Sequence, residues 1–137
     1  MAAGRPLRIG IFVFDGAEEL DVVGPYEVLS WWAQHLRTDA EVRTFSQDGS
    51  GVRCAKGLCL VPDTSSDDLG RCRCSSTRAV RAPALAKDPD HLTWVRSMRA
   101  TTPLLTSVCT GSLVYAAAGL LGGRPATTHW SAFDELA

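Results

Sequence analysis

The stretch that decides the fold is Leu104-Leu105-Thr106-Ser107-Val108-Cys109-Thr110-Gly111-Ser112-Leu113-Val114. A largely apolar run typical of a strand leads directly into Cys109, and a helical pattern begins at Gly111. This order predicts a nucleophile elbow, a sharp strand-to-helix turn that forces its central residue into a strained backbone. The amide groups that open the helix face such a residue and favour its thiolate. We therefore predict that Cys109 is a nucleophile; the alternative is a buried cysteine that acts as a small hydrophobe.

Composition narrows the class of protein. The chain has 137 residues, 45% of them hydrophobic and 21% charged, and a formal net charge of -1. These values predict one globular domain and show no basic excess for binding nucleic acid. No apolar run is long enough to cross a membrane, and the first six residues lack the apolar core of a signal peptide. We expect a cytoplasmic protein with five free cysteines and no metal site, because no His, Cys or carboxylate spacing suits a metal.

Strand and helix patterns alternate along the chain. The nearly continuous apolar run 7–14 predicts a central strand that is buried on both faces. The patterns that follow predict a helix opened by Gly24-Pro25, strands at 41–46 and 57–63, a helix at 89–98, the strand 104–108, a helix at 111–121 and another from Trp130. This alternation predicts a three-layer α/β/α sandwich with a mostly parallel, flavodoxin-like central sheet.

One segment, 70–83, departs from this pattern. It carries four arginines and no strand pattern, although the alternation requires a core strand there. An exposed, basic, flexible loop is one interpretation. We favour another: a shifted reading frame of GC-rich codons can encode an apolar strand followed by a Gly-rich turn. The segment is then a local frameshift, and sequencing the DNA tests this hypothesis.

Three segments resemble one family. They are 12–28, which contains Asp-Gly-Ala-Glu-Glu-Leu-Asp, 107–112, which contains Cys-Thr-Gly-Ser, and 117–130, which ends in Thr-Thr-His-Trp. They are similar to the ThiJ/PfpI superfamily, which has the class I glutamine amidotransferase-like fold, and within it to the isonitrile hydratases and the amidase-like domains of AraC-type regulators. The resemblance covers 7–63 and 84–137. Family members continue past this C-terminus, so the resemblance implies a single domain, 1–137, that lacks its last third.

Asp21 is the predicted acid of the site. It lies in the loop after the first strand, and the carboxyl ends of parallel strands meet at one edge of a sheet, so Asp21 can reach Cys109. The resemblance implies the same, because an acidic residue at this position contacts the nucleophile in the superfamily and is Asp in the isonitrile hydratase branch. We predict that Asp21 donates a proton to the thiolate or acts as general acid and base; capping of the first helix is the alternative.

Four further positions complete the predicted site. Many proteases and amidases of the superfamily carry His where this chain has Thr110, which disfavours peptidase or glutaminase chemistry. Thr110 can stabilise developing negative charge or cap the helix. His129 can orient the thiolate, shuttle a proton or be structural. We expect Gly111 and Gly24 to line the substrate position. Other polar residues, predicted to be solvated, are Glu18, Glu19, His35 and His91.

The resemblance implies an isonitrile hydratase-like enzyme that adds water to a small isonitrile and yields an N-substituted formamide. Cys109 attacks or polarises the terminal carbon, Asp21 handles protons, and no cofactor is needed. One alternative is a non-catalytic, ligand-sensing domain of an AraC-type regulator, and another is glyoxalase- or deglycase-like activity on α-oxo-aldehydes. A fourth is a chain that is not competent because core elements are missing. Family members commonly dimerise, which implies a homodimer, and Trp31-Trp32 is predicted to pack the first helix on the sheet or to form a dimer surface.

Overall fold

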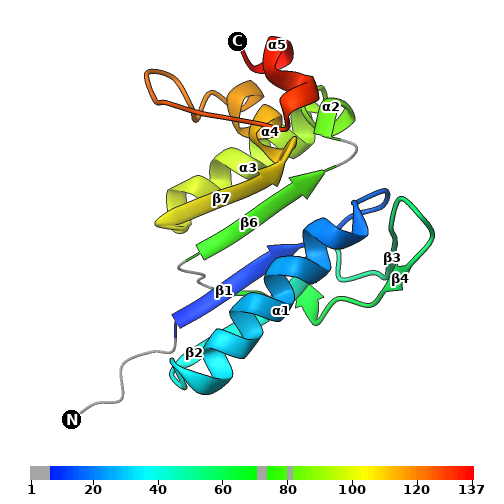
Figure 1. Ribbon diagram of the computed structural model, residues 1–137, viewed down its shortest axis with the longest axis vertical. Helices are drawn as coiled ribbons and strands as arrows, with labels where there is room; N and C mark the ends of the chain where they lie inside the picture. The colour runs from blue at the N-terminus through cyan, green and yellow to red at the C-terminus, as the bar shows by residue number, and fades with distance from the viewer. Residues whose placement is uncertain (1–6, 71–73, 80–81) are drawn as a thin grey trace.

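The computed structural model describes residues 7–70, 74–79 and 82–137, and no side chain between 71 and 83. Its elements are β1 (Leu7–Phe12), α1 (Glu19–His35), β2 (Ala40–Ser46), β3 (Val52–Arg53), β4 (Cys59–Leu60), β5 (Thr64–Ser65), β6 (Cys74–Ala79), α2 (Ala82–Leu85), α3 (Pro89–Thr101), β7 (Leu104–Cys109), α4 (Gly111–Ala117), the 3-10 helix η1 (Trp130–Ala132) and α5 (Phe133–Leu136) (Figure 1). A five-stranded parallel sheet has the order β5-β2-β1-β6-β7, and β3 and β4 form a separate antiparallel hairpin. The predicted α/β fold is confirmed. In the described residues, no helix is both long enough and apolar enough to span a membrane.

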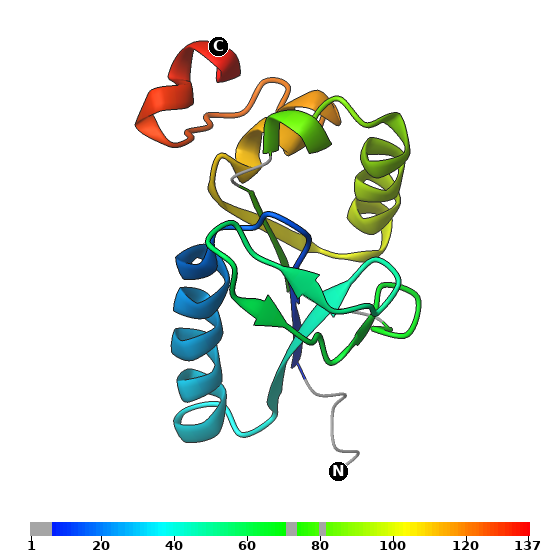
Figure 2. The same ribbon diagram turned by 90° about the vertical axis from the view of Figure 1, so that its right-hand side faces the viewer.

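The sheet is the middle of three layers. Figure 2 shows α1 on one side of it and α3 on the other. Successive side chains of β1 and of the residue after it point to opposite faces of the sheet. Ile11 and Val13 pack with Val22 of α1 on one face. Phe12 contacts Trp94 of α3 on the other face, with ring centroids 4.7 Å apart. Both faces of β1 are therefore buried, as the continuous apolar run predicts.

The strand order reverses between β1 and β6. From β1 the chain first builds outward to β2 and then returns to the other side for β6 and β7. Cys109 at the end of β7 is in register with Ala79 at the end of β6. In open parallel sheets, ligands bind outside the carboxyl ends of the strands where the order reverses, and this is the edge that carries the elbow.

The segment with the anomalous composition contributes a strand. Residues Cys74–Ala79 form β6, which pairs with β1 on one side and β7 on the other. The interpretation of this span as a flexible loop is wrong, because the alternation of the fold requires a strand between these two neighbours. Residues 71–73 and 80–81 lie outside the described residues. The frameshift itself stays a prediction, which sequencing the DNA tests.

Several predicted boundaries differ from the structure. Helix α1 begins at Glu19, not at Gly24-Pro25, and Pro25 lies inside it. A proline there has no N–H to donate, so it cannot bond the carbonyl of Asp21 one turn earlier. Helix α4 stops well before Gly122, because Gly119 takes a positive φ of 77° and ends it. The predicted strand 57–63 is only the short β4 of a hairpin, and its partner β3 was not predicted.

His91 is buried, which corrects the expectation that it is solvated. It is 3% exposed and packs against two rings, Phe12 with centroids 5.8 Å apart and Trp94 with centroids 5.3 Å apart. Within the described part of the chain, its Nε2 has no hydrogen-bond partner. Burial lowers the pKa of His91, and nearby Asp88 opposes this only in part. The folded chain therefore holds this imidazole in its neutral form.

This burial predicts a loss of stability in acid. Above the ordinary imidazole pKa of about 6.5, His91 is neutral whether the chain is folded or unfolded, and its contribution to stability is intact. As the pH falls below that value, the unfolded chain takes up a proton that the folded chain resists, so the free energy of unfolding decreases by up to about 1.4 kcal/mol per pH unit. Urea denaturation at several pH values between 5 and 8 should show this slope reduced in His91→Phe. The exposed His35→Phe variant is the control, and equal slopes in both variants contradict the assignment.

Candidate active site

The turn between β7 and α4 has the geometry of a nucleophile elbow. Cys109, the last residue of β7, has φ of +55°, and it is the only residue other than glycine with positive φ in the described part of the chain. Thr110 follows with φ of -81° and ψ of 5°, and α4 begins at Gly111. A non-glycine residue in this conformation costs about 1–3 kcal/mol and persists only where its surroundings enforce it. The predicted strained turn is confirmed.

The surroundings of the elbow enforce this conformation. Residues 111 to 115 of α4 are all buried, and the Tyr115 hydroxyl donates to the Thr106 carbonyl at 2.8 Å. On the other side, the Thr128 hydroxyl donates to the carbonyl of Cys109 at 3.3 Å. Thr110 occupies the N-cap position, but its side chain makes no capping hydrogen bond, so the capping alternative for this hydroxyl is wrong. The helix and the 128 segment together fix the backbone on both sides of the sulfur.

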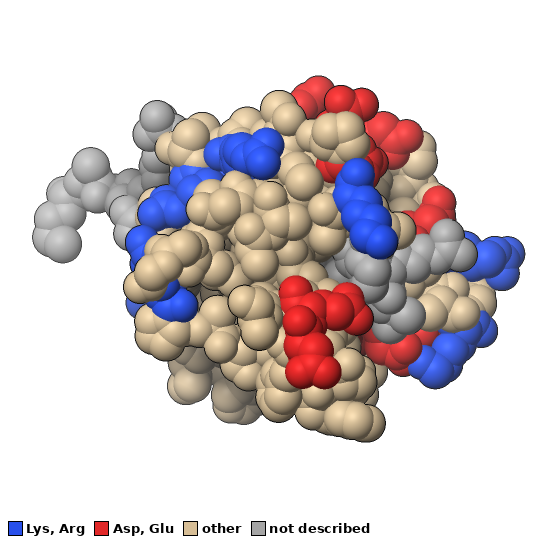
Figure 3. All heavy atoms as spheres, turned by 90° about the horizontal axis from the view of Figure 1, so that it is seen from above, with Lys and Arg blue, Asp and Glu red and all other residues tan. Residues whose placement is uncertain are grey.

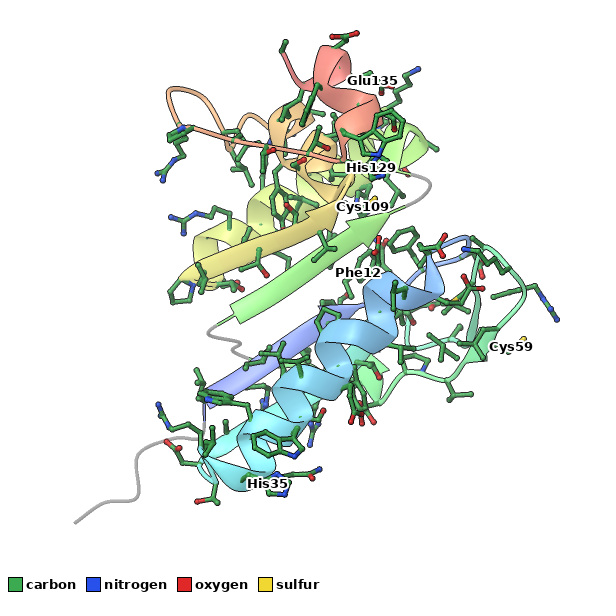
Figure 4. All side chains as sticks on the ribbon, in the orientation of Figure 1. Phe12, His35, Cys59, Cys109, His129 and Glu135 are labelled. Carbon is green, nitrogen blue, oxygen red and sulfur yellow. The ribbon has the colours of Figure 1, made fainter. Side chains whose placement is uncertain are left out.

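His129 lies beside the elbow. It follows Thr128, which contacts Cys109, and Figure 4 shows the side chains of Cys109 and His129 close together at the end of β7. Its Nδ1 accepts a hydrogen bond from the Ser131 amide at 3.3 Å and lies 2.8 Å from the Ser131 hydroxyl. Because an amide can only donate, Nδ1 is the acceptor, and the neutral ring carries its proton on Nε2. The ring is thereby oriented, with Nε2 left to exchange a proton.

Asp21 lies in the first turn of α1, at the same edge of the sheet. The N-cap of this helix is Glu18, so the alternative that Asp21 caps the helix is wrong. Its Oδ2 is buried and has no hydrogen-bond partner among the residues that the structure describes, and the carboxyl does not bond Cys109. The turn before α1 and the elbow are separated by one strand, β6, and thus by two strand spacings of about 10 Å in all.

The two predicted glycines differ in their surroundings. Gly111 is buried at the start of α4, directly after the elbow. Gly24 lies within α1, where the nearest atom to an added Cβ is Leu20 Cδ1 at 4.0 Å. Nothing in the described structure ties Gly24 to the elbow.

Two other cysteines that the structure describes are unlike Cys109. Cys54 is 4% exposed, and burial, reinforced by nearby acidic groups such as Glu19, raises the pKa of its thiol. Such a thiol is a poor nucleophile. Cys59 is exposed on the hairpin, away from the elbow. In the described ranges no group of three or more His, Cys, Asp or Glu side chains is placed to hold a metal ion.

Sequence reasoning missed the contacts of the turn before α1. Glu18 and Glu19 are half-buried and pair with Lys56 of the hairpin, which corrects the expectation that they are solvated. It also missed Thr128, although Thr-Thr-His-Trp is part of the resemblance. Contacts between residues so far apart in the sequence leave no local pattern. Glutamate, lysine and threonine are each usually found at the surface, so none of them alone indicates such a contact.

Comparison with known proteins identifies the family. The DJ-1/PfpI family model matches residues 7–137. The chain belongs to this family. It is 38% identical over 136 residues to the isonitrile hydratase of Pseudomonas putida, covering 95% of this chain and 55% of that protein. It is 31% identical over 134 residues to the HTH-type transcriptional regulator GbdR of Pseudomonas aeruginosa, covering 96% of this chain and 36% of the regulator.

Comparison with solved structures supports the same family. A ThiJ/PfpI family protein from Pseudomonas syringae superposes with a TM-score of 0.82 at 29% identity, over 96% of this chain and 53% of that one. The chain thus spans about half the length of the P. putida isonitrile hydratase and of the P. syringae protein.

The strain at Cys109 predicts an unusual order of stability among variants. At positive φ a Cβ is unfavourable, so Cys109→Gly should be more stable than Cys109→Ala by about 1 kcal/mol, measured by urea denaturation. The control is the same pair at Cys59, where the strand backbone makes glycine the less stable residue. The same order at both positions contradicts a strained elbow.

Proposed function

We propose that this domain has an isonitrile hydratase-like site, in which Cys109 adds water to a small isonitrile. The observation that carries the proposal is the backbone of Cys109, which places a thiol on a strained elbow at the carboxyl edge of the sheet. The similarity to the P. putida isonitrile hydratase supports the substrate class. Figure 3 shows a broad area without Lys, Arg, Asp or Glu on the face seen from above, bordered by separate charged groups.

The proposed reaction uses only the isonitrile and water as reactants. The sulfur of Cys109 bonds to the terminal carbon of R–N≡C, and the thiol proton passes through Asp21 to that carbon, giving the thioimidate R–N=CH–S–Cys109. Water then adds to the same carbon, and one of its protons goes to the nitrogen. The C–S bond breaks with its electron pair returning to sulfur, and the hydroxyl proton returns with it. The product is R–NH–CHO, and the thiol is restored.

The described residues suit these steps. The Thr110 and Gly111 amides follow the sulfur directly and can stabilise negative charge that develops on the substrate. Asp21 is the proton carrier in this proposal, and its Oδ2 has no hydrogen-bond partner among the described residues. His129 Nε2 is a second donor beside the elbow.

A second candidate function is ligand sensing without turnover. It is favoured by the similarity to GbdR, which extends over nearly the whole of this chain. The same elbow and acidic turn then form a binding site, and the chemistry at Cys109 stops at binding.

An activity assay separates the two candidates. With an alkyl isonitrile as substrate and formamide as the measured product, we expect turnover by the wild type, and a loss of at least about a thousandfold in Cys109→Ala because no other thiol shares the elbow. Asp21→Asn should lower the rate by about 10²–10⁴-fold because it removes the proton carrier. Cys59→Ala is the control and should keep full activity.

Other outcomes are equally informative. Equal turnover by the wild type and Cys109→Ala removes the enzyme proposal. Binding of the isonitrile without turnover in the wild type, lost in Cys109→Ala, supports the sensor.

We also propose that the chain forms a homodimer through α1. Its outward side carries three large apolar residues, Leu20, Val28 and Trp31, which are 72%, 67% and 53% exposed, with the exposed Glu27 among them. A surface helix with apolar residues on its solvent side indicates an interface. Trp31 stacks on His35 with centroids 4.4 Å apart, so it does not pack the helix on the sheet.

The dimer proposal predicts the effect of one charge on α1. Val28→Glu places a carboxylate in the apolar interface, where burial of an unpaired charge is unfavourable, and light scattering after gel filtration should give the monomer mass. Lys87→Glu, an exposed change outside this helix, should remain dimeric. A wild-type monomer, or a dimer for both variants, contradicts an interface on this face.

A further inference from the structure

The turn between β1 and α1, residues 13–18, is fastened to the β3–β4 hairpin. Four hydrogen bonds join the turn and the first residue of α1 to residues 53–56 of the hairpin. They run from the Gly16 amide to the Arg53 carbonyl at 2.8 Å, from the Arg53 amide to Asp15 Oδ1 at 2.8 Å, from the Ala55 amide to the Ala17 carbonyl at 2.8 Å, and from the Lys56 amide to Glu19 Oε1 at 2.6 Å. The hairpin thus determines where α1 begins, and Asp21 lies in the first turn of that helix.

Lys56 adds a charge to this attachment. Its Nζ hydrogen-bonds Glu18 Oε1 and lies 3.8 Å from Glu19 Oε2. The hydrogen bond to Glu18 raises the pKa of Lys56, and the charges of Glu18, Glu19 and Asp21 add to this effect. Partial burial opposes ionisation of Glu19, but hydrogen bonds from backbone amides and the Lys56 ammonium outweigh it, so the pKa of Glu19 is lowered. The Lys56 ammonium is therefore the positive charge that offsets part of the negative charge of three carboxylates at the start of α1, those of Glu18, Glu19 and Asp21.

No other cation in the described part of the chain pairs with these carboxylates. The neighbouring Arg53 donates from Nη1 to the Gly57 carbonyl, at 3.2 Å, and so stays within the hairpin. Without Lys56, the like charges of Glu18 and Asp21, which are three residues apart, are no longer offset. The turn also loses the ion pairs that join Glu18 and Glu19 to the hairpin.

We infer that Lys56 is a positioning residue, which acts through Glu18 and Glu19 to hold the Asp21 carboxyl at the edge of the sheet that carries the elbow. The inference rests on the proposed role of Asp21. Lys56 itself is well exposed, 68% by side chain, and is not placed to touch a substrate at Cys109. Exposed ion pairs contribute little to global stability, so the effect of Lys56 is on local order and on the reaction.

The experiment compares Lys56→Met, Lys56→Arg and Lys87→Met in the full chain. Lys87 is the matched control, an exposed lysine for which the structure shows no ion pair. Hydrogen exchange by mass spectrometry is the first readout and is independent of activity. Peptides covering 15–21 and 53–58 should exchange several-fold faster in Lys56→Met, and at the wild-type rate in Lys56→Arg and Lys87→Met, with the thermal midpoint little changed in all three.

The second readout is isonitrile turnover. Lys56→Met should lower kcat by up to about a hundredfold, as misplacement of a catalytic group by about 1 Å can, while KM stays near the wild-type value and Lys56→Arg restores the rate. Wild-type exchange rates in Lys56→Met overturn the inference. So does an unchanged kcat in Lys56→Met while Asp21→Asn is impaired. If the wild type has no turnover, the proposed function fails, and faster exchange in Lys56→Met then confirms only the attachment of the turn.

Discussion

The positive φ of Cys109 is the constraint on which the candidate site depends. It directs a thiol out of the sheet, and it is unfavourable for a residue with a Cβ. The packing of α4 outweighs this cost, because Leu113, Val114 and Tyr115 are all buried and each such side chain contributes about 1.5–3 kcal/mol. The strain of about 1–3 kcal/mol is therefore small beside the burial that follows it, and the fold can sustain an unfavourable backbone at this one residue.

The parallel sheet turns this local strain into a site. All of its strands end at one edge, so the elbow after β7 and the acidic turn after β1 lie at the same edge although they are far apart in sequence. Strand β6 sets the distance between them, because it pairs with both neighbours. The composition of 70–83 did not indicate a strand, yet the backbone between two parallel neighbours forms one. Pairing partners decide strand formation here more than residue preference does.

The features predicted from the sequence are those with a local pattern. A continuous apolar run marked β1, and the order of strand, Cys109 and Gly111 marked the elbow. His91 had a usable signal, since it lies one turn before Val95 on the buried side of α3, but its polarity suggested a surface residue. The pairing of Lys56 with Glu18 had no such signal, because the two residues meet only after the hairpin folds onto the turn before α1. The start of α1 was misplaced because Pro25 is usually read as a first-turn residue, whereas here the helix tolerates it further inside.

The two sides of the site differ in how firmly they are held. The elbow is fixed by buried side chains of α4 and by Thr128, whereas the turn that leads to Asp21 is held by hydrogen bonds and an exposed ammonium. Interactions of the second kind are weakened by solvent and salt, so this turn is the part of the site that can adjust. An enzyme and a sensor can share such an arrangement. In an enzyme the adjustable side must return a proton in each cycle, while in a sensor its movement on binding can itself be the signal. The two functions that we propose therefore differ in one respect, which is whether a bond formed at Cys109 is broken again.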